Sequence, residues 1–156
     1  MASGTVAQAL EALLAQTPQL RCLDLGAGWG AHRVLFQLGA LPDCLARCRH
    51  LTRLVLQDEG LSELPAGDYL TGLRELSLAK NNFTHLPPAL STATALEHLD
   101  FKGLDASCLP DDALDILCSL PRLKKLWLSS IPVEWQHRLP HVQQWERIEF
   151  LCESGV

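Results

Sequence analysis

The chain has 156 residues; 47% of them are apolar and only 6% aromatic, and 13 basic against 18 acidic side chains give a formal charge of -5. This length suits one domain, residues 1–156, with a continuous core supplied mainly by leucine. The acidic balance argues against a nucleic-acid partner or an anionic membrane surface, because phosphate binding requires positive potential. No apolar run approaches the roughly eighteen residues of a membrane-spanning helix.

The first expected element is an N-terminal helix within residues 1–19. Four apolar residues recur at the spacing of one helical face: Val6, Leu10, Leu13 and Leu14. The polar face carries Gln and Glu and no Lys or Arg, unlike helices that lie on membrane surfaces, and Thr17-Pro18 should end the helix. We expect it to cap the first layer of the repeats that follow.

An apolar triad then recurs along the chain, in copies that start near residues 20, 51, 73, 96, 123 and 145. The copies are Leu20/Leu23/Leu25, Leu51/Leu54/Leu56, Leu73/Leu76/Leu78, Leu96/Leu99/Phe101, Leu123/Leu126/Leu128 and the less regular Trp145/Ile148/Phe150. Within each triad the apolar residues alternate, which predicts a short strand with its leucines pointing inward. About six such strands are expected to stack in parallel into one sheet.

The segments that connect the strands differ in kind. Two short returns end at Pro65 and Pro87, which predicts extended or 3₁₀ structure there. Apolar residues within 34–48 recur at helical spacing, as do Leu114 and Leu117 after an acidic start. These two longer returns are therefore expected to be helical.

The unit from Leu73 to Pro87 matches the leucine-rich-repeat pattern at every defining position, including Asn81. Over about residues 20–151 the chain resembles the leucine-rich-repeat family, which implies an α/β solenoid, a horseshoe arc with a parallel sheet on its concave side. In that family the asparagine satisfies backbone groups of the turn leaving each strand. Where it is missing, turn amides must find other partners. The equivalent positions here hold Gly28, Glu59, Leu104, Ile131 and Glu153.

The resemblance also implies a function, since family members generally bind proteins or peptides on the concave sheet. We expect a non-catalytic interaction module that needs no cofactor. The candidate partner-binding residues are Arg53, Glu75, His98, Asp100, Lys102, Lys125 and Trp127. Trp127 is either a binding anchor or a ring that shields the C-terminal end of the array. Arg53, Glu75, His98 and Lys125 could instead form a solvated cross-strand charge ladder.

The last predicted strand, Arg147 to Leu151, is followed by five residues and no capping helix. An uncovered edge strand can pair with another chain, so self-association is possible. The outward positions of six strands fall just below the roughly 20–30 residues per side of a standard interface. Either flanking loops join the contact, or the chain is a structural fragment of a larger receptor or effector of this family.

A competing hypothesis comes from the segment Asp24 to Gly30, which looks like the first motif of S-adenosylmethionine-dependent methyltransferases. In that family a strand delivers an acid and then glycines that let the backbone approach the cofactor. A second strand ending in an acid should follow after about 20 residues. Here the first acid after a strand is Asp58, so the repeat interpretation is preferred.

Two further spacings are candidate metal sites. His137 and His141 are four apart, but Pro140 breaks the helix that would align them. Cys44 and Cys48 share that spacing and are better explained as small apolar residues on the buried side of a return. Neither spacing therefore predicts a bound metal. Six cysteines without an export signal are expected to be mostly reduced, which predicts a cytoplasmic protein.

Overall fold

The computed structural model describes residues 3–26, 37–104, 111–130, 135, 137 and 149–152. The strands are β1 (Cys22–Asp24), β2 (Arg53–Val55), β3 (Glu75–Ser77), β4 (His98–Asp100), β5 (Lys125–Leu128) and β6 (Glu149–Cys152). The helices are α1 (Ser3–Gln16), α2 (Asp111–Cys118) and three 3₁₀ turns, η1 (Asp43–Arg47), η2 (Asp68–Leu70) and η3 (Pro88–Thr92). Among these helices none is long and apolar enough to cross a membrane.

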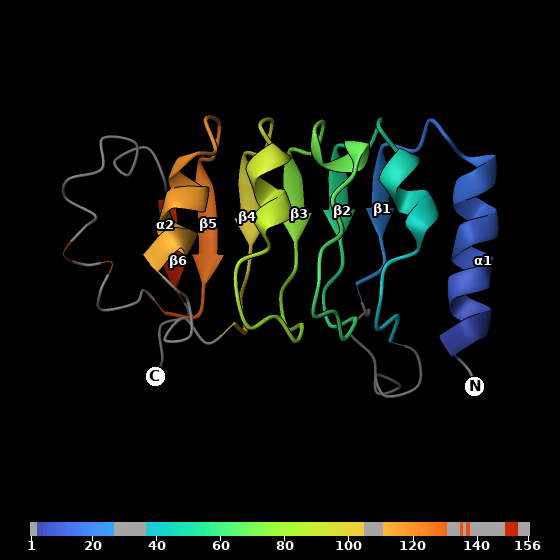
Figure 1. Cartoon of the computed structure of the whole chain (residues 1–156), viewed down its shortest axis with the longest axis horizontal. Helices are drawn as coiled ribbons and strands as arrows, with labels where there is room; N and C mark the ends of the chain where they lie inside the picture. The colour runs from blue at the N-terminus through green and yellow to red at the C-terminus, as the bar shows by residue number, and fades with distance from the viewer. Residues whose placement is uncertain are drawn as a thin grey trace.

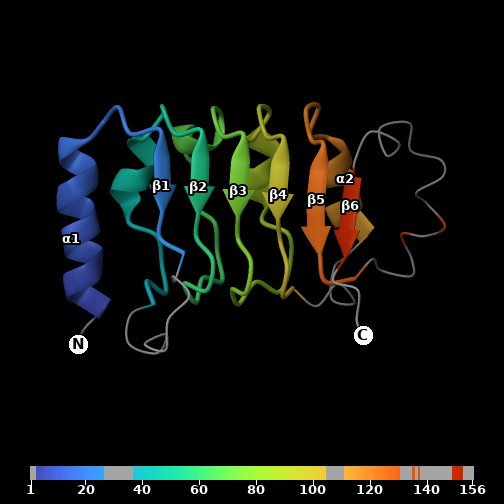
Figure 2. The same ribbon diagram turned by 180° about the vertical axis from the view of Figure 1, so that it is seen from behind.

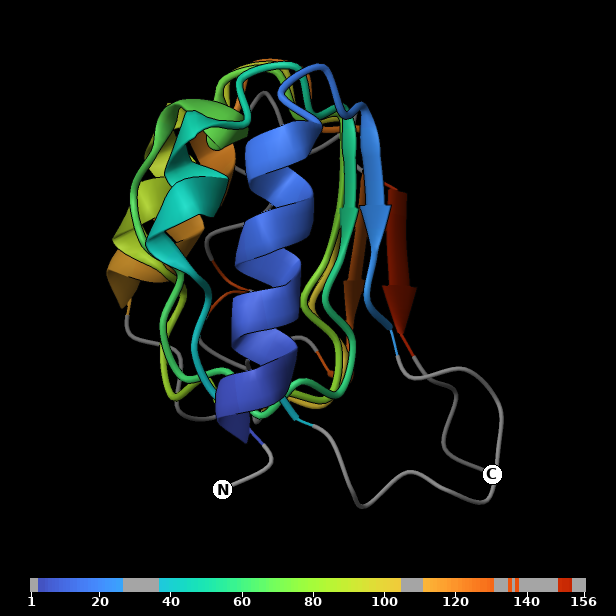
Figure 3. The same cartoon turned by 90° about the vertical axis from the view of Figure 1, so that its right-hand side faces the viewer.

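The six strands form one parallel sheet in the order of the sequence, β1 to β6 (Figures 1 and 2). Each strand pairs with the next in register, so that the middle residues Leu23, Leu54, Leu76, Leu99 and Leu126 lie side by side. Seen end-on, the sheet forms one side of the molecule and the helical returns form the other (Figure 3). The fold is an α/β leucine-rich-repeat solenoid, as the triads predicted.

The core lies between the sheet and the returns. Leu54, Leu99 and Leu126 are 0% exposed and belong to one hydrophobic cluster with Leu23 and Leu76. The returns add residues that the triads did not identify, among them Tyr69, Leu70 and Trp135, which are also fully buried. Each buried leucine stabilises the fold by roughly 1.5–3 kcal/mol before chain entropy is counted.

Helix α1 covers the first layer of the solenoid, beside β1 (Figures 2 and 3). Leu10 and Leu14 are buried in the core, which confirms the predicted cap. The predicted apolar face was too wide, however, because Leu13 is 51% exposed. Leu10 and Leu14 are one helical turn apart, and Leu13 is rotated out of that stripe toward solvent.

The returns are mostly 3₁₀ in character. Those containing η2 and η3 confirm the prediction, and α2 confirms the helix predicted after an acidic start. The helix predicted over 34–48 was wrong where the structure describes it: within 37–48 only η1 is helical. Gly39 has a φ of +68°, and its amide donates to the Glu59 carbonyl of the next repeat at 2.9 Å. A helix cannot continue through that conformation and that cross-repeat bond.

The register of the last repeat also differs from the prediction. Phe150, not Ile148, lies opposite Leu126, and Glu149 lies opposite Lys125. The Glu149 amide donates to the Lys124 carbonyl, which fixes this pairing. The shift is by two residues, so residues keep the face that strand alternation assigned to them. Trp145 and Ile148 lie outside the described residues.

Asn81 joins two successive repeats through their turns. Its Nδ2 donates to the carbonyls of Leu56 at 2.7 Å and Leu78 at 2.9 Å. Its Oδ1 accepts from the amides of Glu59 and Leu61, both at 3.0 Å. One side chain therefore satisfies four backbone groups, which is the role that the family resemblance implied.

Other residues replace the asparagine in the neighbouring repeats. Glu59, one repeat earlier, is buried, and its Oε2 accepts from the Leu38 amide at 3.1 Å. Burial raises the pKa of the Glu59 carboxyl, and the Leu38 hydrogen bond opposes that rise. In a later repeat Ser129 Oγ accepts from the Gly103 amide at 2.7 Å. These turn amides thus find other partners, as predicted.

Candidate functional site

The face of the sheet turned away from the returns, called the open face below, carries a hollow of about 220 Å³ over β2 to β5. Leu54 and Leu76 line it, together with residues at outward positions of the strands. Five of the seven predicted binding residues line it: Arg53, Glu75, His98, Asp100 and Trp127. The repeat register brings together residues that are up to 74 positions apart in the sequence.

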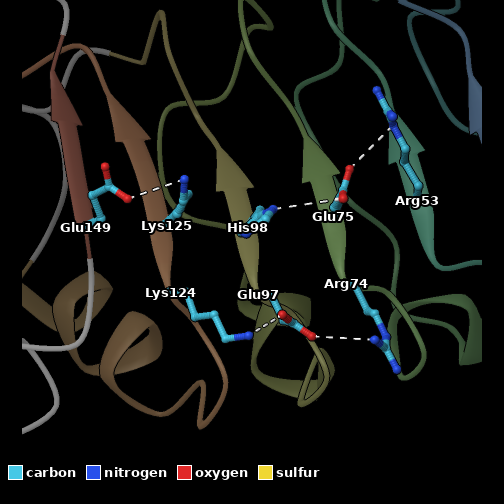
Figure 4. A network of polar contacts seen from close by, with 8 residues as sticks. All are labelled: Arg53, Arg74, Glu75, Glu97, His98, Lys124, Lys125 and Glu149. Atoms are coloured by element: carbon cyan, nitrogen blue, oxygen red, sulfur yellow. Dashed lines mark hydrogen bonds and ion pairs between the residues drawn. The ribbon is translucent and has the colours of Figure 1, made fainter.

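Charged side chains cross the open face in a row along the first position of the strands (Figure 4). Glu75 lies between Arg53, at 3.6 Å, and His98, at 4.0 Å. The Arg53 and Glu75 side chains are 53% and 48% exposed, so the pair adds only about 0–1 kcal/mol. The predicted charge ladder is present from Arg53 to His98, whereas Lys125, predicted to continue it, pairs with Glu149 instead. These exposed groups are accessible to a partner.

Trp127 stands at the far wall of the hollow. Its ring meets the His98 ring edge-on, with centroids 6.2 Å apart and an interplanar angle of 89°. The ring is half-buried, so a partner can still cover part of it. Strand β6 lies beyond β5 and pairs Leu151 with Trp127, which means that the ring does not belong to the last layer.

Asp100 places a carboxylate inside the hollow, on the strand next to Trp127. Its Oδ1 accepts from the Lys102 amide at 3.2 Å, and its Oδ2 lies 3.5 Å from Ser77 Oγ. Within the described residues no cationic side chain pairs with it. The hollow therefore retains acceptor capacity for a donor group of a ligand.

The remaining two predicted residues lie outside the hollow. Lys125 is on the open face, where its Nζ lies 3.4 Å from Glu149 of β6. Lys102 follows β4, is half-buried, and bonds the neighbouring repeat when its carbonyl accepts from the Lys80 amide at 2.7 Å. Lys125 can reach a ligand at the rim of the hollow, whereas Lys102 belongs mainly to the turn.

A second charged row, which the sequence reasoning missed, lies where the strands begin (Figure 4). Glu97 receives the Lys124 ammonium at 2.5 Å and lies 3.7 Å from Arg74. The hydrogen bond from Lys124, with both nearby cations, lowers the pKa of the Glu97 carboxyl. The available signal was a charge directly after the first leucine of three successive triads.

The methyltransferase motif lies at the first strand of the sheet. Only Asp24 to Gly26 of it are described, and there the Gly26 amide donates to Asp24 Oδ1 at 3.0 Å. The described strands run in simple sequential order, with no reversal of the kind that creates a cofactor crevice in doubly wound sheets. This geometry does not favour a cofactor site around Asp24.

The two spacings weighed as metal sites do not gather ligands in the described part of the chain. His137 is exposed, and His141 lies outside the described residues. Cys48 is buried and its thiol lies 3.7 Å from the Cys44 carbonyl. Burial raises the pKa of both thiols, which disfavours the thiolate that a metal requires.

Comparisons with known proteins support the fold. No protein-family model matches the chain, and no curated protein matches it in sequence. Among solved structures it is similar to a leucine-rich-repeat protein of Leptospira interrogans, with a TM-score of 0.60 and 24% identity. The match covers 87% of this chain and 31% of that one. The chain thus spans about a third of the length of its structural neighbour, and the likeness shows the shared solenoid fold.

Proposed function

We propose that this protein is a non-catalytic interaction module that binds a protein or peptide partner on its open face. The observation that supports it most is the hollow over β2 to β5, where an aromatic ring, a carboxylate that no described cation neutralises and a solvated ion-pair row meet. The hollow is smaller than the roughly 300–1,000 Å³ of small-molecule sites. It suits a single large side chain from a partner whose other residues cover the sheet around it.

Trp127 is the proposed anchor of that contact. Half-buried aromatic rings at the centre of an interface commonly supply much of its binding energy, because they bury a large apolar area with little loss of conformational freedom. Its edge-on contact with His98 holds the ring in place before binding. Arg53, Glu75 and Asp100 line the same hollow, and Lys125 lies on the same strand as Trp127. These charged groups would set orientation and specificity.

Site-specific photo-crosslinking tests the proposal in a native cell extract. A benzoylphenylalanine at Ser77, inside the hollow, should give a discrete adduct with the partner. The same probe at Ser91, exposed on the return that contains η3, is the matched control and should give none. An adduct from Ser91 with none from Ser77 would place the contact on the opposite face.

We further propose one cytoplasmic domain that can self-associate. The core cluster extends from Leu10 to Trp135, which supports a single domain. Cys22, Cys44 and Cys48 are free thiols, which agrees with a reducing compartment.

Among the described strands β6 has one neighbour, so its outer edge offers a place for a second copy. Light scattering across a concentration series tests this: a constant monomer mass at high concentration would exclude it.

A further inference from the structure

The edge of the sheet where the strands begin is a continuous surface built from equivalent positions. The residues that follow the first leucine of each triad stack on one another. The backbone amide of each donates to the backbone carbonyl of the equivalent residue one repeat earlier, along the series Arg21, Thr52, Arg74, Glu97 and Lys124. The tight turns just before these residues also stack. Gly72, in one turn, lies so close to the turn of the preceding repeat that a Cβ atom added to it would be 3.4 Å from the Arg49 carbonyl oxygen. We call this surface the start edge; it is the upper edge in Figure 2 and the lower edge in Figure 4.

Positive charge gathers on the start edge. Five cations lie there, all exposed: Arg21, Arg49, Arg74, Arg122 and Lys124. In the described residues that form the edge the one carboxylate is Glu97, and Arg74 and Lys124 already neutralise it. The chain as a whole carries -5, so this local excess is a segregation of charge that the total conceals.

Part of the start edge is also concave. A surface hollow of about 380 Å³ is lined by Glu97, Pro121, Arg122, Leu123 and Lys124. Arg49 and Arg122 make no ion pair with any described residue. Their guanidinium groups are therefore available for bidentate contacts with carboxylates.

We propose that the start edge binds an acidic peptide segment of a protein partner. The cations run from β1 to β5, four inter-strand steps of ~4.8 Å, or ~19 Å, which an extended segment of about six residues can span. Carboxylates on alternate residues of such a segment would face the guanidinium groups. This site is separate from the hollow of the open face and goes beyond the function proposed above.

Charge and composition favour an acidic peptide over a nucleic acid. Single-stranded nucleic acids bind where bases can stack on aromatic rings, and the described start edge, residues 17–21, 49–52, 71–74, 94–97 and 119–124, contains no Phe, Tyr or Trp. A long polyanion would also meet the net negative charge of the rest of the chain, whereas a short acidic segment would not.

Fluorescence anisotropy with a fluorescein-labelled peptide of six glutamates, flanked by glycine and serine, tests the site on the full chain. We expect binding that weakens as salt rises from 50 to 300 mM, and a loss of at least fivefold in affinity for Arg49→Gln/Arg122→Gln. The matched control is Lys80→Gln/Lys102→Gln, which removes the same charge from the opposite edge and should change affinity less than twofold. Arg49→Lys/Arg122→Lys should retain most of the binding, and Trp127→Ala all of it.

Three outcomes would overturn the proposal. These are no binding of the peptide at low salt, equal losses for the two glutamine double variants, or equal affinity for a single-stranded DNA 12-mer that depends on the same arginines. Because Arg49 and Arg122 are exposed, circular dichroism melts should show both double variants folded. If Trp127→Ala bound the open-face partner with unchanged affinity, that result would instead count against the function proposed above. The failures of the two proposals are therefore distinguishable.

Discussion

The inward and outward residues of each strand are one position apart in sequence and lie in opposite environments. Leu54 and Leu76 are 0% and 2% exposed, whereas the side chains of their neighbours Arg53 and Glu75 are 53% and 48% exposed. The inward column fills a shared core and tolerates little change. The outward column contributes little to stability and is free to be shaped by a partner. Stability and recognition are therefore assigned to opposite faces of the same short strands.

The largest expected effect is on the inward column. Leu99 is fully buried in β4, one of the two central strands, and Leu99→Ala would leave a cavity that the packed repeats cannot collapse. We expect a loss of about 2–5 kcal/mol in the free energy of unfolding, measured with urea. Its outward neighbour provides the comparison: His98→Ala should cost less than about 1 kcal/mol. Similar losses for the two variants would contradict the division between the faces.

The next effect concerns the turn that Asn81 supports. Asn81→Ala would leave the amides of Glu59 and Leu61 without their side-chain acceptor, and an unsatisfied buried group costs about 1–3 kcal/mol. We expect a loss of about 2 kcal/mol in unfolding free energy without a change in partner affinity. Asn82→Ala is the matched control, because Asn82 is exposed and its Nδ2 makes one longer bond, 3.3 Å to the Gly60 carbonyl. Equal stability of the two variants would show that the hydrogen bonds of Asn81 between the two repeats do not stabilise the fold.

A smaller effect should appear in the pH dependence of stability. The folded-state pKa of Glu59 is raised above 4.5 by burial, so the folded state holds this proton more tightly than the unfolded state. The stabilisation is full below pH 4.5 and is lost as pH rises through the raised folded pKa. Glu59→Gln keeps an acceptor for the Leu38 amide and should be more stable than the wild type at pH 8, with little difference at pH 4.

Chemical denaturation at both pH values measures this difference. Glu63→Gln, an exposed residue of the same return, is the matched control and should follow the wild-type profile. A Glu59→Gln variant that is less stable than the wild type at pH 8 would mean that the charged carboxylate itself supports the turn.

The smallest effect is expected from the ion-pair row of the open face. A double-mutant cycle on Arg53→Ala and Glu75→Ala should give a coupling energy below about 1 kcal/mol, reduced further in 0.5 M salt. The same variants should alter partner association more than they alter stability. A coupling energy well above that bound would show that the row is part of the structural framework.

The fold was predictable because its information is periodic. Leu51, Leu73 and Leu96 each begin a triad whose spacing specifies strand, inward face and parallel stacking, and these positions are all fully buried. The prediction failed where the period alone was used: in the last repeat, cross-strand bonds set a register two residues from the apolar pattern. The helix predicted over this return, described from residue 37 to 48, failed for a similar reason. The hydrogen bond from the Gly39 amide to the Glu59 carbonyl of the next repeat competes with helical hydrogen bonds within the segment.

The candidate site was predictable only in part. Strand alternation assigned Arg53, Glu75 and Trp127 to the outward face, and the structure gathers them around one hollow. The direction of the Lys102 side chain depends on the turn after β4 and did not follow from alternation. The start edge was missed because total charge was used as a guide to partners, although only the fold shows where the individual charges lie.

The most direct test of the account compares the affinity and stability of one variant at the open face. Calorimetric titration of the captured partner into wild type, Trp127→Ala and His85→Ala, an exposed site away from the hollow, should be paired with thermal melts of each. The account predicts that Trp127→Ala weakens binding at least tenfold while its melting temperature stays within a few degrees of the wild type. Unchanged affinity together with a large drop in melting temperature would show that Trp127 supports the fold and that the partner binds elsewhere.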